Sequence, residues 1–354
     1  MSWTRIAAAA ALLCFPLLRS GAQEPARANS TVFFAQDDQA IAQFEENAER
    51  TRPMVDALVL ALTGQPDLAK AWGSLVSPAD RVGIKIATSG GRYFSSHHGI
   101  VAAIVAGLES AGVRRDRIII WDRNSSDLRA AGYLPSPREV GVVQAIDPPR
   151  GYDREAPMTA PVLGKLMWGD LLFAEKQRTA FGKAKNDGDQ LSSTSHLARI
   201  VSRDVTKIIN VPVLSDDHGC GVAGAIYNAS VPNVDNWRRF THADGTVSTS
   251  PAEVYADERI GPKVVLHIMD ALLAQYAGGP AFNPNYSFAH QTIYASKDPV
   301  ALDAVALRKI EEWRKQAKLP SIARQAAWLA SAAEMGLGNV RDEAIVLRQV
   351  EPAK

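Results

Sequence analysis

The sequence predicts an α/β fold: a mostly parallel or mixed sheet with helices on both faces and one long insertion. Short runs rich in valine and isoleucine alternate with segments of helical spacing, which is the pattern of strands and crossover helices. The clearest unit is a strand at 81–87, a helix at 98–111 and a strand at 117–122, which predicts parallel strands joined by a right-handed crossover. With 46% hydrophobic and 22% charged residues among 354, we expect one large domain with a sizeable core.

Residues 1–22 have the features of a secretory signal peptide. Arg5 precedes the apolar run 6–18, and Ser20 and Ala22 are small residues at the two positions that a signal peptidase reads. Cleavage after Ala22 would export the mature chain to the periplasm or the medium, with no stable membrane insertion afterwards. An uncleaved anchor is the alternative, although the apolar run is short for a membrane span.

Cysteine content and net charge argue against an internal disulfide and against nucleic-acid binding. Cys14 leaves with the signal peptide, so Cys220 remains alone and no internal disulfide can form. We interpret Cys220 as a small buried residue in a tight turn, with a metal ligand or reactive thiol as the alternative. A net charge of +1, without a basic cluster interleaved with aromatics, argues against a nucleic-acid partner.

The predicted elements divide the mature chain into an N-terminal extension, 23–80, and the α/β domain, 81–350. Residues 23–45 are polar, and we expect partial disorder before a helix whose apolar residues are Met54, Leu58, Ala61 and Leu62. Residues 147–190 form a long irregular segment, which we interpret as an insertion or lid that carries some local structure of its own. The remaining predictions are helices at 127–131, 195–202, 260–276, 299–317 and 321–335, and strands at 140–146, 207–213, 291–295 and 344–350.

The stretch 207–228, KIINVPVLSDDHGCGVAGAIYN, is typical of a strand that leads into a binding or catalytic loop. A β-branched run predicts a buried strand, and Pro212 marks its end or an unpaired position. Asp216, Asp217 and His218 follow at once, among glycines that let the backbone turn tightly and approach a ligand.

Polar residues also follow the other predicted strands. Lys85 ends the first strand, Asp122 the second, and Asp298 follows the strand at 291–295. Ligands of open α/β sheets bind outside the carboxyl ends of the strands, so we expect these residues to converge on one crevice with His218. The alternative is that polar residues begin wherever strands stop.

Two further groups are candidates for the site. Asp303 shares an apolar helix face with Val300 and Leu307, which is costly for a carboxylate unless it is paired, metal-bound or protonated. A buried structural ion pair is the alternative. The asparagine-rich loop that contains Asn228, Asn233 and Asn236 suits oxyanion or sugar-like recognition, although a loop held together by its own asparagines would look the same.

Three ordered blocks resemble the domain of unknown function 362 family over roughly residues 80 to 315: VGIKIATSGG with AAIVAGLESAGV and IIIWDR, the central stretch above, and IYASKDPVALDAVAL. The resemblance implies an α/β domain and, for this exported branch, no iron–sulfur ferredoxin module. Two lysines of the family pattern are replaced here, by Ser215 or Asp216 and by Tyr227. The matching positions are Lys85, Asp122, His218, Asn228, Asp298 and Asp303.

These observations lead to two hypotheses. The first is an exported enzyme that acts on a small polar or anionic substrate, with His218 as general base or as ligand of a divalent metal ion. Asp217 or Asp303 would orient His218, Asp217 would complete the metal set, and Lys85 would hold an anionic group. Further ligand-binding residues would be Asp122, Asn228, Asp298, Asn233 and Asn236. The second hypothesis is a non-catalytic exported protein that binds a small ligand in the same crevice.

Overall fold

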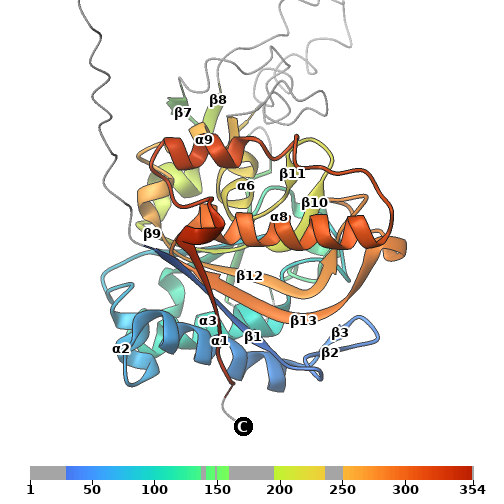
Figure 1. Ribbon diagram of the computed structural model, residues 1–354. Helices are drawn as coiled ribbons and strands as arrows, with labels where there is room; N and C mark the ends of the chain where they lie inside the picture. The colour runs from blue at the N-terminus through green and yellow to red at the C-terminus, as the bar shows by residue number, and fades with distance from the viewer. Residues whose placement is uncertain (1–28, 137–140, 148–149, 159–194, 236–249, 353–354) are drawn as a thin grey trace, which may run out of the picture.

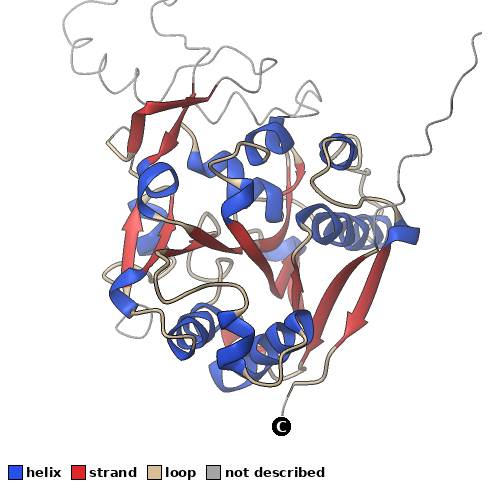
Figure 2. Ribbon diagram, turned by 90° about the vertical axis from the view of Figure 1, so that its left-hand side faces the viewer, coloured by secondary structure: helices blue, strands red, loops and turns tan. Residues whose placement is uncertain are grey.

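The computed structural model describes residues 29–136, 141–147, 150–158, 195–235 and 250–352. Its main element is a sheet of ten strands with helices on both faces (Figures 1 and 2). The strands are β1 (Ser30–Gln36), β4 (Val82–Ile86), β5 (Ile118–Asp122), β6 (Val142–Ala145), β9 (Lys207–Val211), β10 (Val213–Asp217), β11 (Gly221–Val222), β12 (Val264–Gln275), β13 (Ser287–Ser296) and β14 (Ile345–Gln349). The predicted α/β class is therefore confirmed.

The strand order is β14-β1-β13-β12-β9-β4-β5-β6, and β10 continues beside β12 where Pro212 interrupts the edge of β9. Along this path β13 runs antiparallel to both of its neighbours, whereas the other pairs are parallel. The chain leaves β4 toward β5 and β6 on one side and returns as β9 on the other. The sheet therefore has a topological switch point between β4 and β9, which is where open α/β sheets bind ligands.

Two apolar cores lie on the two faces of the sheet. One is covered by α1 (Ala48–Thr63), α2 (Leu68–Gly73) and α3 (His98–Ser110), and the other by α6 (Ala225–Ser230), α7 (Ser250–Tyr255), α8 (Pro299–Gln316) and α9 (Trp328–Glu334) (Figure 1). Side chains alternate between the cores because successive residues of a strand face opposite ways. In β4, Ile84 and Ile86 pack under α3, and Lys85 between them faces α6.

The ends of the long helices follow from local chemistry. Asn47 accepts a hydrogen bond from Glu49 at the start of α1, and Gly64 ends it in the left-handed conformation that glycine adopts readily. Asp298 caps α8 by accepting from the amide of Ala301, and Pro299 occupies its first turn. The predicted helix 299–317 is thus confirmed. None of the described helices is long and apolar enough to cross a membrane.

The predicted helix 260–276 is wrong, because this segment forms β12. Ten of its twelve residues, from Leu266 to Gln275, are buried, since β12 lies between β9 and β13 in the middle of the sheet with helices on both faces. A strand buried on both faces has a continuous apolar run without alternation, so its periodicity does not distinguish it from a buried helix.

The N-terminal segment is part of the same sheet and not an extension of it. β1 pairs with β13 on one side and with β14 on the other, so the partial disorder expected for 23–45 is wrong from residue 30 onward. After β1 come a small hairpin of β2 (Ile41–Ala42) and β3 (Glu45–Glu46). The predicted signal peptide lies outside the described residues, and so do 23–28.

Two other predictions need correction. The segment 195–202, predicted to be helical, starts as β8 (Ser195–Ala198), which pairs with β7 (Tyr152–Met158), and only then forms a helical turn, Ile200–Asp204. The helix predicted at 321–335 is shorter and corresponds to α9. The segment 147–190 contains β7, which agrees with the local structure expected there, and its part from 159 onward lies outside the described residues.

Candidate functional site

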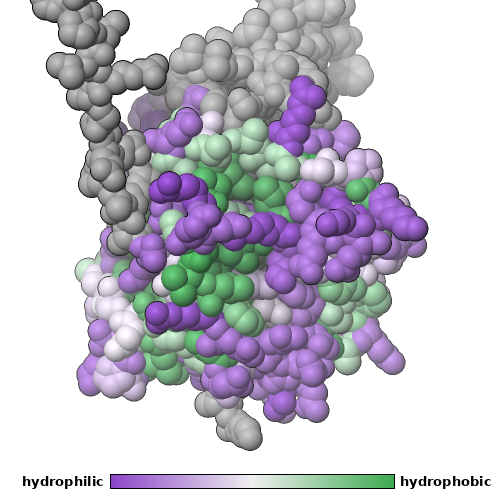
Figure 3. All heavy atoms as spheres, viewed as in Figure 1, coloured by the Kyte–Doolittle hydropathy of each residue, from purple (hydrophilic) through white to green (hydrophobic). Residues whose placement is uncertain are grey.

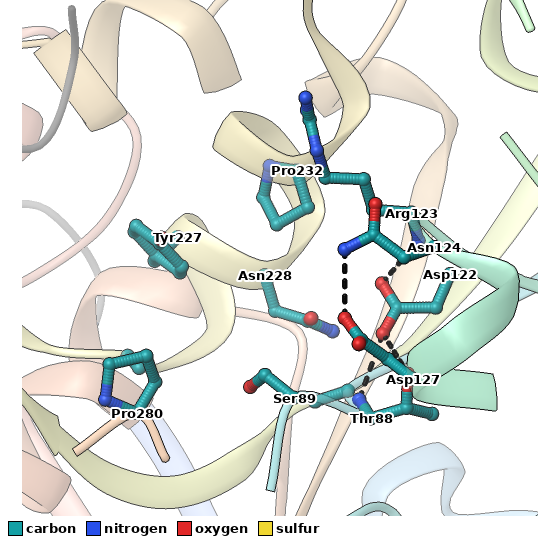
Figure 4. Close-up of a pocket in the computed structure, with 12 residues that line it drawn as sticks. Thr88, Ser89, Asp122, Arg123, Asn124, Asp127, Tyr227, Asn228, Pro232 and Pro280 are labelled. Carbon is teal, nitrogen blue, oxygen red and sulfur yellow. Dashed lines mark hydrogen bonds between the residues drawn. The ribbon is translucent and has the colours of Figure 1, made fainter. Parts of the chain in front are cut away.

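A pocket of about 240 Å³ opens at the carboxyl ends of β4 and β5, beside the switch point of the sheet (Figure 4). Three segments form most of its wall: the loop after β4, the end of β5 with α4 (Ser125–Ala130), and α6 with its flanks. The lining residues are Ala87, Thr88, Ser89, Asp122, Arg123, Asn124, Asp127, Ala223, Tyr227, Asn228, Pro232 and Pro280.

Lys85 lies directly behind this pocket and is fully buried. Its Nζ donates to the carbonyl of Ile86 at 2.6 Å, to Oδ1 of Asp122 at 2.7 Å and to Oδ1 of Asn228 at 3.0 Å. Burial lowers the pKa of Lys85, and the Asp122 carboxylate opposes this shift. All three N–H groups of the ammonium are used within the protein, so the predicted role of Lys85 in holding a substrate anion is not supported.

Asp122 presents a fixed carboxylate to the pocket. Its Oδ1 also accepts from the amide of Arg123 at 2.8 Å, and its Oδ2 accepts from the amide of Thr88 at 2.8 Å and the hydroxyl of Thr88 at 2.6 Å (Figure 4). Four hydrogen bonds occupy the acceptor positions of a carboxylate. Asp122 is therefore held in one orientation and has little capacity left to accept a proton from a ligand.

A chain of hydrogen bonds continues from Lys85 through the core on the α6 face. Asn228 Nδ2 donates to Asn210 Oδ1 at 2.8 Å, Asn210 Nδ2 lies 3.0 Å from His267 Nδ1, and His267 Nε2 lies 3.2 Å from the hydroxyl of Tyr255. Because an ammonium can only donate, Asn228 must offer its oxygen to Lys85, and this fixes each later donor and acceptor. His267 then accepts at Nδ1 and carries its proton on Nε2.

The strands place this chain in one row across the sheet. Lys85 in β4 is in register with Asn210 in β9, and Asn210 is in register with His267 in β12. Burial lowers the pKa of His267 to about 3, so the imidazole is neutral at ordinary pH. We call Lys85, Asn210, Asn228 and His267 the polar row. It holds Asn228 in place without a charge beyond the Lys85–Asp122 pair.

Asp303 fixes the helix that carries Tyr227 and Asn228. Its two oxygens accept from the first two amides of α6, those of Ala225 and Ile226, the second at 2.9 Å. Burial raises the pKa of Asp303 to about 7, against the two N–H groups, which lower it. Asp303 does not line the pocket, and its place is behind α6.

Gly224 lets α6 approach Asp303 this closely. A Cβ atom at Gly224 would lie 2.0 Å from an oxygen of Asp303, so a larger residue would push the helix away from the carboxylate.

The polar groups left for a ligand are Ser89, Asn124, Asp127 and Tyr227. Within the described residues, no hydrogen-bond partner occupies the hydroxyl of Ser89 or of Tyr227. Asn124 Nδ2 donates to Asp127 Oδ2 at 2.8 Å, which places an amide and a carboxylate side by side (Figure 4). Burial raises the pKa of Tyr227 well above its usual value, so the phenol remains a donor.

His218 is not part of this pocket. It is exposed in the turn after β10 and lines a separate cavity with Asp216, whereas Asp217 Oδ1 accepts from the amides of Gly219 and Cys220. Cys220 is a free thiol buried in that turn, as predicted. In the described part of the chain, no three histidine, cysteine or acidic side chains are grouped so that they could hold a metal ion. The expected metal set of His218 and Asp217 thus lacks a third ligand there.

Two more predicted ligand-binding residues have structural partners. Asp298 accepts from the amides of Ala301 and Asn339, each at 2.8 Å, and so joins α8 to the C-terminal segment. Asn233 accepts from the indole of Trp121 and donates to the carbonyl of Ala229, both at 2.8 Å. Asn236 lies outside the described residues.

The single-crevice prediction therefore holds in part. The structure brings together Lys85, Asp122 and Asn228, and separates them from His218 and Asp303. Sequence reasoning missed Asn210, although a polar residue in the middle of the β-branched run 207–213 was a usable signal. It also missed His267, because the strand that carries it was taken for a helix.

Comparison with known proteins gives a family but no activity. The family model described as Domain of unknown function (DUF362) matches residues 82–308, which include the pocket wall and the polar row. No curated protein matches the chain. A crystal structure of a protein from Thermotoga maritima matches with 11% sequence identity and a TM-score of 0.37, covering 80% of this chain and 60% of that chain. This chain thus spans less than two thirds of that protein.

Proposed function

We propose that this chain, which belongs to the DUF362 family, is an exported enzyme that acts on a small polar molecule without net negative charge. The substrate would bind in the pocket at the carboxyl ends of β4 and β5. The proposal keeps the class of small polar substrates expected from the sequence and replaces the anionic alternative. Export rests on the features of residues 1–22 alone.

The charge around the pocket carries the proposal. The ammonium of Lys85 is neutralised by Asp122, 2.7 Å away. Arg123 donates to the carbonyl of Val234 at 2.9 Å and lies over the ring of Tyr152, and in Figure 4 its guanidinium points away from Asp122 and Asn228. Asp127 is then the charged group that faces the cavity, which favours a neutral or cationic substrate.

The roles that we propose follow from which groups have free hydrogen-bonding capacity. Asp127 is the proton acceptor, because its carboxylate lies in the pocket wall with only side-chain donors beside it. Tyr227 and Ser89 donate hydroxyl protons to the substrate, and Pro232 and Pro280 contribute apolar wall. Asp122 and Asn228 are positioning residues, because the polar row and Thr88 already use their hydrogen-bonding atoms.

A screen of neutral, cationic and anionic small molecules against the mature chain tests this proposal. Binding is followed by the shift in melting temperature and turnover by product formation, for the wild type and for Asp127→Asn and Tyr227→Phe. We expect binders among the neutral and cationic compounds, and at least about a tenfold loss of turnover in Asp127→Asn. Glu312→Gln, an exposed residue of α8 paired with Lys309, is the matched control. A clear preference for anionic compounds would refute the proposal.

A non-catalytic binding protein is the second candidate. It is favoured by the saturation of Asp122, whose four hydrogen bonds leave no obvious base at the bottom of the pocket. Tight binding of a compound by the wild type, lost in Tyr227→Phe and unaccompanied by any product at stoichiometric enzyme, would establish the binding protein in place of the enzyme.

A further inference from the structure

A second cavity, of about 440 Å³, lies where three segments meet: the turn after β10, the turn between β12 and β13, and the segment after α8. Hydrophilic side chains gather on the surface at the C-terminal end of α8, on the right of Figure 3. Six polar residues line the cavity: Asp216, His218, Tyr286, Arg314, Ser321 and Gln325. The proposed activity of the first pocket uses none of them.

Two residues that line this cavity, Asp216 and Gln325, carry buried acceptors. The oxygen Oε1 of Gln325 is buried, and no partner for it exists within the described residues. Asp216 is almost fully buried, and its Oδ1 accepts from the amide of Gly279 at 2.9 Å. Burial raises the pKa of Asp216, although the amide of Gly279, the charge of Arg314 and a hydrogen bond with Gln275 lower it. A buried acceptor without a partner is rare in folded proteins and indicates a missing donor.

Arg314, which also lines the cavity, is a fixed donor. Arg314 Nε donates to the carbonyl of Pro320 at 2.7 Å and Nη1 donates to the carbonyl of Tyr276 at 2.8 Å, so the guanidinium cannot swing away. Its Nη2 has no partner among the residues that the structure describes. His218 stands exposed at the rim. A guanidinium held in this way is suited to a carboxylate.

We propose that this cavity binds a small zwitterion such as a free amino acid. Its ammonium would donate to Asp216 and to Oε1 of Gln325, and its carboxylate would accept from Arg314 and His218. Both kinds of charge are required, because a cation alone would face Arg314 and an anion alone would face Asp216. This inference stands independently of the function proposed for the first pocket.

The experiment measures the melting temperature of the mature chain with each free L-amino acid at millimolar concentration. Hits are then compared by calorimetry with the two analogues that keep only the amine or only the carboxylate. We expect at least one amino acid to stabilise the protein and each single-charge analogue to bind at least about tenfold more weakly. Absence of stabilisation by any amino acid, or equal binding of a single-charge analogue, would overturn the proposal.

Two variants separate binding from folding. Gln325→Leu removes the buried acceptor, so the ligand-free melting temperature should stay the same or rise while the response to the amino acid is lost. Asp216→Asn should lose the response as well. Asp342→Asn, which changes an exposed carboxylate paired with Arg308, is the control and should respond like the wild type. A full response in Gln325→Leu would contradict the assignment of the ammonium site.

Discussion

His267 and Asp270 lie three residues apart in β12 and point to opposite faces of the sheet, and the pKa of the histidine on each face is shifted in the opposite direction. On the α6 face, the hydrogen-bond partners of His267 are the neutral side chains of Asn210 and Tyr255, and burial lowers its pKa to about 3. On the α3 face, Asp270 lies 2.7 Å from Nδ1 of His97. There burial also lowers the pKa of His97, but Asp270 and then Glu46 outweigh it, and the pKa is raised.

Burial alone therefore does not set the pKa of a core histidine. Asn210, the neutral partner of His267, belongs to the polar row, which positions Asn228 and, through Lys85, the pocket carboxylate. The charged partner of His97 fixes the start of α3, since Asp270 also accepts from the backbone amide of His97 at 2.7 Å. One face therefore supports the candidate site, and the other supports the helix packing.

Replacing Lys85 by methionine should have the largest effect on stability, because it leaves Asp122 charged and buried without its cation. We expect a loss of about 3–5 kcal/mol in the free energy of unfolding, measured by urea denaturation. The double variant Lys85→Met/Asp122→Asn should recover part of this loss, since no unpaired charge remains. A single variant within about 1 kcal/mol of the wild type would show that the pair is unimportant for stability.

Asn210→Asp gives His267 the kind of partner that His97 has. The new carboxylate next to Nδ1 should raise the pKa of His267 from about 3 by roughly 1–3 units. The measurement is an NMR titration of the imidazole, with Asn124→Asp in the pocket wall as the control that leaves His267 unchanged. An unshifted His267 resonance in the folded variant contradicts the partner argument.

His267→Gln tests the neutral state of His267 through the pH dependence of stability. A histidine that is neutral in the folded state and protonated in the unfolded state contributes stability above its unfolded pKa of about 6.5. This stability is lost as the pH falls toward 3. The wild type should therefore lose up to about 1.4 kcal/mol per pH unit in this window relative to the variant. Glutamine can still accept from Asn210 and donate to Tyr255. Parallel curves of stability against pH for the two proteins would contradict a neutral His267 in the folded state.

His97→Gln should show the opposite dependence with a smaller effect. Because the folded pKa of His97 is raised, its ion pair is fully present below the unfolded pKa of about 6.5 and is lost as the pH rises through the folded value. We expect the variant to be less stable by about 1–3 kcal/mol at pH 6, with the deficit shrinking above. Chemical denaturation across this range measures the deficit. A deficit that grows with pH would contradict the assigned charge.

Local patterns predicted the short buried strands and the helix with an apolar face. The strands around Lys85 and Asp122 are buried throughout but only five residues long, which favours a strand over a helix, and the helix at 299–317 has helical spacing of its apolar residues. The pattern failed for β12, whose run of twelve residues, ten of them buried, is long enough for a helix, and for β1, whose partners β13 and β14 lie more than 250 residues later. Position at a strand end found Lys85 and Asp122, because parallel strands bring such ends together, whereas Asn228 came from the asparagine-rich loop and the family resemblance.

The direction of a side chain was less predictable. Asp216 and His218 follow a strand as the pocket residues do, yet they line another cavity, because β10 lies beyond Pro212 and next to the far half of β12. Asp303 was correctly singled out as a carboxylate in an apolar seam. Its partners proved to be two backbone amides, which no pattern of side chains reveals.

The short turn at Gly279 and Pro280 is a wall shared by the two cavities. Gly279 lines the second cavity and donates to Asp216, while the next residue, Pro280, lines the pocket beside β4 and β5. A ligand of the second cavity that shifted the bond between Gly279 and Asp216 would also move a residue in the wall of the first pocket. Thermodynamic reciprocity then requires equal coupling in both directions, so either ligand would alter the affinity of the other by the same factor.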